Sequence, residues 1–315
     1  MDAPTVASLG EFGIISRITA GLAAAPAVSV GPGDDAAVFL VNGSSVTSVD
    51  VLVEGVHFRR DWVPAEMLGR RAVAVAAADI EAMGAYQSAV LVGLTVPADT
   101  PVSWLDDLAK GIRLECDAAG AALVGGDLTR GKEVVISVTV MGETRGAAPV
   151  RRSGAVPGDV VAYRGRLGWS GAGLAVLSRG FRSPRALVEA YQLPQVPYGA
   201  GAEARLAGAT AMIDVSDGLI ADLTHIAESS QVGIDLDSGR FDVPDPLHAV
   251  AAATGGDPLR FVLTGGEDHA LVATFPLGSV PLEWQVVGVV TDAEPAVLVD
   301  GKPYDAVPGW DHFRH

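Results

Sequence analysis

The chain has 315 residues, of which 49% are hydrophobic and 19% are charged, and its formal net charge at pH 7 is −16. This much apolar material can build a core, which argues against a disordered chain, and the length fits one large or two medium domains. The negative charge repels phosphate backbones, so we expect neither nucleic acid nor an anionic membrane surface as a partner.

Cysteine usage and the N-terminal segment predict a cytoplasmic protein. The chain has 1 cysteine, Cys116, so no intrachain disulfide can form, which suits a reducing compartment. The first residues lack the basic and apolar regions of a signal peptide. The apolar run from Ala72 to Ala78 is far shorter than the ~20 residues of a membrane-spanning helix.

The first half of the chain alternates between helix and strand patterns. Phe12, Ile15, Ile18 and Leu22 fall on one face at helical spacing and predict an amphipathic helix. Asn42-Gly43 is a strong two-residue hairpin signal, so the strands on either side of it are expected to pair. The other patterns predict helices at 64–83 and 102–119 and strands at 36–41, 46–53, 89–96, 122–124 and 134–140.

A polar, turn-rich stretch at 149–159 separates this half from a second one. We therefore predict an N-terminal domain at 1–148 and a C-terminal domain at 149–315. The second half has helix patterns at 170–178, 184–191, 201–206 and 219–229 and strand patterns at 160–163, 211–215, 271–275, 286–290 and 296–299. The alternation in both halves predicts an α/β or α+β fold.

Two stretches of the sequence partly match nucleotide-binding motifs, but neither match is complete. The stretch from Gly126 to Lys132 matches a phosphate loop until Glu133, and a strand pattern follows where that loop must open a helix. Gly168, Gly171 and Gly173 lie near a helix start, but their spacing is not that of a dinucleotide-binding turn. We interpret these glycines as sites of close packing.

Carboxylates beside small residues are the main chemical pattern. An aspartate next to glycine is usually a turn former or a helix cap, and Asp217 could simply cap the helix that follows it. His57 alone is more often a surface or core histidine than a ligand. The pattern includes Gly33-Asp34-Asp35, Ser48-Val49-Asp50, Asp79, Gly125-Gly126-Asp127, Asp214 to Gly218 and Gly265-Gly266-Glu267-Asp268, most of them expected at strand ends.

The sequence surroundings of Asp79 indicate that this side chain binds a metal ion. Asp79 lies within a nearly all-apolar helix pattern, and no basic residue is within one helical turn, so a bound cation would offset the cost of burying its charge. Mg²⁺ prefers hard oxygen ligands and is usually held by carboxylates together with substrate phosphates. Several carboxylates without lysine partners predict several Mg²⁺ ions, and therefore ATP with a second phosphorylated substrate.

Taken in order, these segments resemble the thiamine-monophosphate kinase family, within the superfamily of aminoimidazole ribonucleotide synthetase. The resemblance runs from GEFGIISRI at residues 10–18 to GWDHF at 309–313. Each motif alone is weak, but the ordered set is highly specific. It consists of GEF, GPGDDAAV, DVLVEGVHF, AVAAADIEAMGA, GGDLTRG, RRSGAVPGD, IDVSDGL and TGGEDHAL.

The resemblance implies a two-domain fold whose N-terminal strands form a barrel shared in a homodimer, with the site between the two domains. It implies that ATP and thiamine phosphate are the substrates, with Asp35, Asp50, Asp79, Asp127 and Asp217 as catalytic carboxylates. By motif, the implied magnesium ligands are Asp35, Ser48, Val49, Asp50, Asp79, Asp127, Asp214 and Asp217. The implied nucleotide contacts are Gly126, Asp127, Arg152 and Ser216, and the implied contacts to thiamine phosphate are His57, Glu267 and Trp310.

Two departures from the family pattern stand out. Val49 replaces a common Thr, so a metal contact there could come only from the backbone. His269 follows Gly-Gly-Glu-Asp, where an aromatic residue is common. Selenophosphate synthetase needs a reactive cysteine or selenocysteine in an N-terminal loop, and no cysteine precedes Cys116.

The expected reaction is transfer of a phosphoryl group from ATP to thiamine phosphate, directly and in line. The alternatives are another ATP-dependent synthetase of the same superfamily, resembling aminoimidazole ribonucleotide synthetase, and a non-catalytic protein that binds divalent cations. Formation of thiamine diphosphate would distinguish the kinase from both of these alternatives.

Overall fold

The computed structural model describes residues 4–22, 25–33 and 36–304, and Asp35 and Trp310 lie outside these ranges. The chain divides into two compact units, residues 1–80 with 86–147 and residues 81–85 with 148–315. No helix of the described ranges is long and apolar enough to cross a membrane.

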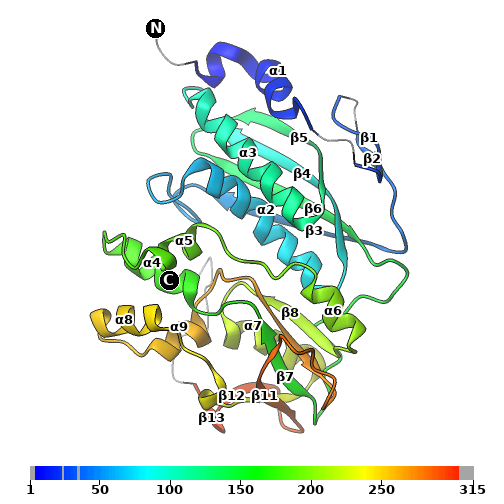
Figure 1. Ribbon diagram of the computed structural model, residues 1–315, viewed down its shortest axis with the longest axis vertical. Coiled ribbons are helices and arrows are strands. Elements are labelled where there is room, and N and C mark those ends of the chain that lie inside the picture. Colours follow the sequence, from blue (N-terminus) through cyan, green and yellow to red (C-terminus); the bar gives the residue numbers. More distant parts are fainter. Residues whose placement is uncertain (1–3, 23–24, 34–35, 305–315) are drawn as a thin grey trace. The chain divides into compact units, whose positions relative to one another are not determined.

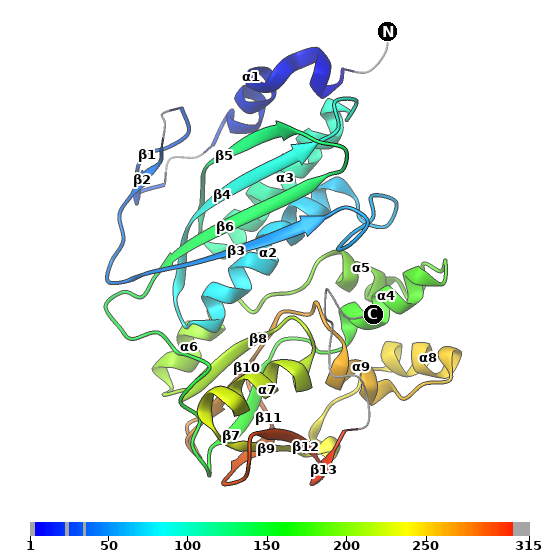
Figure 2. The same ribbon diagram turned by 180° about the vertical axis from the view of Figure 1, so that it is seen from behind.

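The first unit contains a four-stranded sheet in the order β3-β6-β4-β5 and a two-stranded sheet of β1 and β2. Helices α2 and α3 cover one face of the four-stranded sheet, and Figure 2 looks onto the other face (Figures 1 and 2). The elements are α1 (Val6–Thr19), β1 (Val28–Val30), β2 (Val38–Phe39), β3 (Ser45–Val53), α2 (Ala65–Ala82), β4 (Tyr86–Val96), α3 (Val102–Ala119), β5 (Ala122–Arg130) and β6 (Val135–Glu143).

Burial alternates along these strands, as expected for a sheet covered on one side. Ile136, Val138 and Val140 of β6 are buried, whereas Val49 and Val51 of β3 are 59% and 45% exposed. The first unit therefore keeps an exposed, partly apolar sheet face.

Most predicted elements of this half are confirmed, but the predicted hairpin is wrong. β3 pairs with β6 along its whole length, and β2 pairs with β1. The backbone N–H of Arg145 donates to the carbonyl of Asn42, so the Asn42-Gly43 segment extends the ladder with a distant strand. The local turn signal is outweighed by the long ladder with β6.

The first helix also differs from its predicted face. Phe12 is 82% exposed, whereas Ile14 is 1% exposed. The backbone at Gly10 is not helical, so the helix is kinked near its start.

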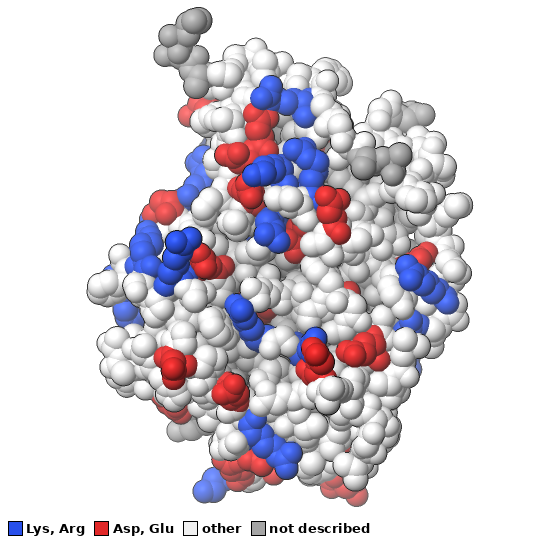
Figure 3. All heavy atoms as spheres, in the orientation of Figure 1, with Lys and Arg blue, Asp and Glu red and all other residues white. Residues whose placement is uncertain are grey.

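The surface of the first unit mixes charges of both signs (Figure 3). Arg17 pairs with Asp106, Lys110 with Glu66, and Arg70 with Glu115. Each of these three carboxylates thus has a basic partner.

Helices α2 and α3 approach each other through glycine. A Cβ built on Gly111 of α3 would lie 1.9 Å from the carbonyl oxygen of Glu66, whereas one on Gly13 of α1 would have its nearest contact at 3.4 Å.

We expect Gly111→Ala to lower the Tm by about 5 °C or more, because overpacking costs roughly 1–3 kcal/mol and the clash is with backbone. Gly13→Ala, the matched control, is expected to leave the Tm unchanged or raise it. Calorimetry measures both, and equal Tm values for the two variants would contradict the close approach.

The second unit is built on a seven-stranded sheet in the order β13-β12-β9-β11-β7-β10-β8. β9 and β12 are its parallel pair, and the ladders on either side are antiparallel. Its strands are β7 (Val160–Arg164), β8 (Ala211–Val215), β9 (Gly233–Leu236), β10 (Ala270–Phe275), β11 (Gln285–Thr291), β12 (Ala296–Val299) and β13 (Lys302–Pro303). Its helices are α4 (Trp169–Ser178), α5 (Arg185–Gln192), α6 (Ala200–Leu206), α7 (Leu219–Ser230), α8 (Asp245–Thr254) and α9 (Pro258–Thr264), with a short 3-10 helix at Ser238–Arg240.

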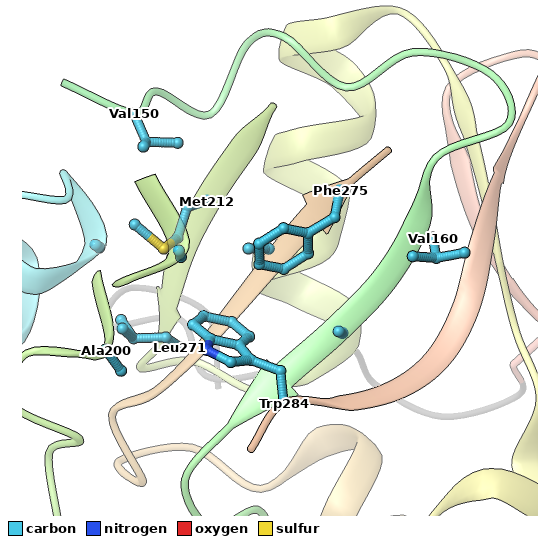
Figure 4. Close-up of a cluster of buried hydrophobic side chains, with 11 residues drawn as sticks. Val150, Val160, Ala200, Met212, Leu271, Phe275 and Trp284 are labelled. Carbon is cyan, nitrogen blue, oxygen red and sulfur yellow. The ribbon is translucent and has the colours of Figure 1, made fainter. Parts of the chain in front are cut away.

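A core of buried side chains packs on the β7, β8 and β10 part of this sheet (Figure 4). Phe275 and Trp284 meet edge to face, with ring centroids 5.3 Å apart, and Met212 packs in the same cluster. The sequence patterns did not predict β9, α8 and α9. The close-packing interpretation of Gly173 is confirmed, because a Cβ there would lie 2.1 Å from the carbonyl oxygen of Leu187 on α5.

Candidate functional site

The first group of candidate residues lies where strand β3 faces helix α2. Ser48 and Asp50 are two residues apart on β3, so their side chains share one face of the sheet. The Ser48 hydroxyl donates a hydrogen bond to the Asp79 carboxylate on α2. All three side chains are half-buried, and the Val49 side chain points to the opposite, exposed face.

This group supplies hard oxygen donors, which is the chemistry that Mg²⁺ prefers. Across residues 4–22, 25–33 and 36–304, however, no cluster of three or more His, Cys, Asp or Glu side chains lies close enough to hold an ion. The candidate ligands of the second unit are Asp214 on β8 and Asp217 in the turn that follows it.

Asp127 lies inside β5, which continues beyond the strand predicted at 122–124. The ladders place Asp50, Val138, Val92 and Gly126 side by side, and such cross-strand partners share a face of the sheet. Asp127, the next residue, therefore points to the opposite face from Asp50. The strand continues through the two glycines because β5 pairs with β4 along its length.

The glycine at 126 is required by the sheet itself. A Cβ there would lie 2.1 Å from the carbonyl oxygen of Val92 on the neighbouring strand. Both Gly126 and Asp127 are exposed. The strand that follows, β6, also confirms that no phosphate loop opens a helix here.

An apolar pocket adjoins Gly126 and Asp127 on the side of α1 and α3. Its lining includes Ile15 and Ile18 of α1, Leu108 and Ile112 of α3, and Leu94 of β4. Sequence reasoning missed this pocket because the apolar periodicity of residues 102–119 predicted only a helix. The nearby pair of glycines, which takes up little space, is the signal that could have located it.

His57 lies in the loop after β3. Its ring Nδ1 accepts a hydrogen bond from the backbone N–H of Val53 at 2.9 Å. Because that nitrogen is an acceptor, a neutral His57 carries its proton on Nε2. The ring is thereby held at the end of the strand that carries Ser48 and Asp50.

The second group of candidates lies at the end of edge strand β8 and in the turn to α7. The N-cap residue of α7 is Gly218, one position after Asp217. Asp222 of α7 reaches back and accepts the backbone N–H groups of Asp217 and Gly218 at 3.1 and 3.0 Å. The buried Asp222 carboxylate thus fixes the backbone of the turn that carries Ser216 and Asp217.

The Gly265–His269 segment is bound to this turn. Glu267 and His269 donate backbone hydrogen bonds to the carbonyls of Ser216 and Val215, at 2.7 and 2.8 Å. A Cβ on Gly266 would lie 2.7 Å from the Ser216 carbonyl oxygen, so only glycine fits. Glu267 has a φ of 66°, in the left-handed region, which indicates that the surroundings fix its backbone.

Two buried carboxylates support this arrangement. Burial raises the pKa of Asp222 to about 7, assisted by the charges of Asp214 and Asp217. Burial likewise raises the pKa of Asp268 to about 7, while the backbone N–H groups of Gly168 and Ser170 donate to its carboxylate and oppose that shift. Asp268 thereby joins the segment to the first residues of α4.

The backbone of Arg152 lies away from the Ser216 turn. Its carbonyl accepts from the Ser230 hydroxyl at the end of α7, and the neighbouring Arg151 carbonyl accepts from the N–H of Met212. Met212 and Ser216 are four residues apart, roughly 13 Å along a strand. The backbone of Arg152 thus lies near the opposite end of β8.

Comparison with known proteins identifies the superfamily. The N-terminal domain model of AIR synthase related protein matches residues 33–144, and its C-terminal domain model matches residues 156–300. The thiamine-monophosphate kinase of Mycobacterium tuberculosis is 48% identical over 314 residues, which cover 99% of this chain and 94% of that protein. The thiamine-monophosphate kinase of Corynebacterium glutamicum is 41% identical over 323 residues, covering 99% and 96%.

Solved structures give the same result. The structure of AaThiL complexed with AMPPCP and TMP has a TM-score of 0.80 and 30% identity, covering 99% of this chain and 100% of that one. The hydrogenase maturation protein HypE in complex with ATP has a TM-score of 0.70 at 17% identity, a likeness of fold alone. The predicted two-domain α/β fold is thereby confirmed.

Proposed function

Because the chain belongs to the thiamine-monophosphate kinase family, we propose that it transfers the γ-phosphate of ATP to thiamine phosphate, giving thiamine diphosphate and ADP. The observation that carries the proposal is the full-length similarity to these kinases. The carboxylate groups on β3, α2 and the β8 turn support it, because they are the side chains that phosphoryl transfer with Mg²⁺ requires.

Several Mg²⁺ ions are part of this proposal. The oxygen donors Ser48, Asp50 and Asp79 in the first unit, and Asp214 and Asp217 in the second, suit Mg²⁺ in kind. When bound, Mg²⁺ would neutralise the charge of both phosphates and of the transition state. Asp127 would serve a different ion from Asp50, because the two point to opposite faces of the sheet, and Asp35 stays a prediction. At Val49 only the backbone carbonyl could take part.

The protein's own residues then bind and orient the two substrates. The nucleophile is a phosphate oxygen of thiamine phosphate, whose second pKa of about 6 leaves it largely ionised at pH 7 without a general base. Transfer is direct and in line, and a chiral γ-phosphate is expected to invert its configuration. Gly126, Asp127, Ser216 and Arg152 would contact the nucleotide, and His57 and Glu267 the thiamine phosphate.

The apolar pocket between α1 and α3 suits the adenine base. The aliphatic side chains that line the pocket can pack against the faces of an aromatic base. The pocket also adjoins Gly126 and Asp127. A base there would leave its phosphates near the exposed edge strand β5.

The test is incubation of the protein with ATP, Mg²⁺ and thiamine phosphate, followed by chromatography of the products. Thiamine diphosphate and ADP in equal amounts are expected. A cyclised or amidated product from another substrate would favour the alternative synthetase, and binding of divalent cations without ATP turnover would favour a non-catalytic protein. Given its ATP requirement and its single cysteine, we place the reaction in the cytoplasm.

A homodimer is also proposed. The sheet face that carries Val49 and Val51 is exposed in the single chain, and a second copy would bury it across a two-fold axis. Light scattering at micromolar concentration is expected to give about twice the chain mass of 32.2 kDa. A monomer under those conditions would contradict this proposal.

Trp310 lies outside the described residues and stays a prediction from the sequence. An indole can stack on the pyrimidine of thiamine and attract its cationic thiazolium, a contact worth ~0.5–2 kcal/mol. We expect Trp310→Ala to raise the KM for thiamine phosphate several-fold and to leave the KM for ATP nearly unchanged. Steady-state kinetics with each substrate varied provide the measurement, and Trp310→Phe is expected to recover part of the loss. An equal change in both KM values would argue for a purely structural tail.

A further inference from the structure

His269 is a buried histidine in contact with a candidate metal ligand. Its side chain is 8% exposed, and its Nδ1 lies 3.0 Å from Oδ2 of Asp214, whose side chain is 5% exposed. His225 and His248 of the same unit are exposed. Neither the motif pattern nor the proposed mechanism gives His269 a function.

The backbone holds His269 in place. The residue has a φ of 52°, in the left-handed region that a histidine seldom adopts. Its N–H donates to the Val215 carbonyl, and the neighbouring Asp268 is joined to the start of α4. The imidazole is therefore presented to the end of β8 from a backbone fixed on both sides.

The hydrogen bond to His269 also makes the two carboxylate oxygens of Asp214 different from each other. Among the described residues, the Asp214 carboxylate hydrogen-bonds to His269 alone, through Oδ2. As a carboxylate it can only accept, so Nδ1 of His269 is the donor. Oδ1 is thus left for another ligand, in surroundings made more negative by Asp217 and Asp222.

We infer that His269 is a positioning residue, which fixes Asp214 through Oδ2 so that Oδ1 is held ready for a divalent cation. The inference rests on the proposed function for the identity of that cation. Outer hydrogen bonds of this kind orient metal ligands, and losing one typically weakens metal affinity by roughly 10–100-fold. The aromatic residue that is common at this position in the family has no Nδ1, so this chain would hold Asp214 in its own way.

Two substitutions at position 269 separate the hydrogen bond from bulk. His269→Asn keeps an N–H donor near the place of Nδ1 and tolerates the left-handed backbone. His269→Phe keeps a ring of similar size and removes the donor. His248→Phe, on the exposed face of α8, is the matched control for a histidine-to-phenylalanine change.

The first readout is Mn²⁺ binding, followed by electron paramagnetic resonance without thiamine phosphate. We expect His269→Phe to weaken Mn²⁺ binding at one site by about 10-fold, while His269→Asn recovers most of the affinity and His248→Phe equals the wild type. Equal Mn²⁺ affinity in His269→Phe and the wild type would overturn the inference, as would equal losses in the Phe and Asn variants.

The second readout is steady-state kinetics. The Mg²⁺ concentration for half-maximal rate is expected to rise in His269→Phe, with the KM for thiamine phosphate unchanged. A change confined to the KM for thiamine phosphate would overturn the inference, since it would mean that His269 contacts the substrate. A wild-type protein that binds Mn²⁺ but makes no thiamine diphosphate would instead contradict the proposed function, so the two failures are distinguishable.

Discussion

Replacing Asp79 by asparagine is expected to lower kcat at least ~100-fold, because it weakens the hold on a Mg²⁺ ion, and losing one group that stabilises transition-state charge costs about 2.7–4 kcal/mol. Asp79 lies on α2 and receives the hydroxyl of Ser48, which is next but one to Asp50 on β3. Asparagine keeps the size and the ability to accept from Ser48, but it lacks the charge that attracts Mg²⁺.

The fold is expected to survive this change, because Asp79 is only half-buried and asparagine can still accept the hydrogen bond from Ser48. Asp107→Asn, on the exposed side of α3, changes the net charge equally and is the matched control. Coupled assays of ADP formation and circular dichroism provide the measurements. A folded Asp79→Asn protein with full activity would refute a metal role for the β3–α2 group.

Asp127→Asn is the second change with a large expected effect, again at least ~100-fold in kcat. Its side chain is exposed on edge strand β5 and faces away from Asp50 and Val138. An exposed carboxylate in a strand has little structural value by itself, so the substitution is expected to leave the Tm unchanged. A large loss of turnover without a loss of stability would therefore identify a direct role.

The two aspartates can also be told apart. If they serve different ions, each single variant is expected to change a different step in the titration of rate against Mg²⁺, and the double variant to be worse than either. Wild-type turnover in Asp127→Asn, with Asp79→Asn inactive, would leave the exposed face of β5 without a catalytic function.

The exposed sheet face and the candidate site meet on the same strand. Val49 and Val51 point to one side of β3, and Ser48 and Asp50 point to the other. A partner bound on the first side would therefore fix the strand that carries the candidate ligands on the second. This is a physical reason for the proposed homodimer to matter to turnover as well as to assembly.

The sequence by itself was enough for most of the helices and strands and for the family. The apolar stripe of Leu105, Leu108 and Ile112 predicted α3, and the ordered motifs from GEF to GGED predicted the superfamily that the comparisons confirm. Both kinds of signal are local, because helical periodicity and short motifs need only neighbouring residues. The same local reasoning failed at Asn42-Gly43, where the strands pair with distant partners.

Tertiary structure alone decided how the candidate residues face. Whether Asp127 shares a side of the sheet with Asp50 depends on the register of three ladders, and a shift of one residue would reverse it. That Asp222 accepts the backbone N–H groups of Asp217 and Gly218 at the start of α7 depends on packing within the second unit. The bond between His269 and Asp214 joins residues 55 positions apart in the chain. Contacts at such separations arise from the free energy of burying whole faces, and so no pattern of neighbouring residues could have predicted them.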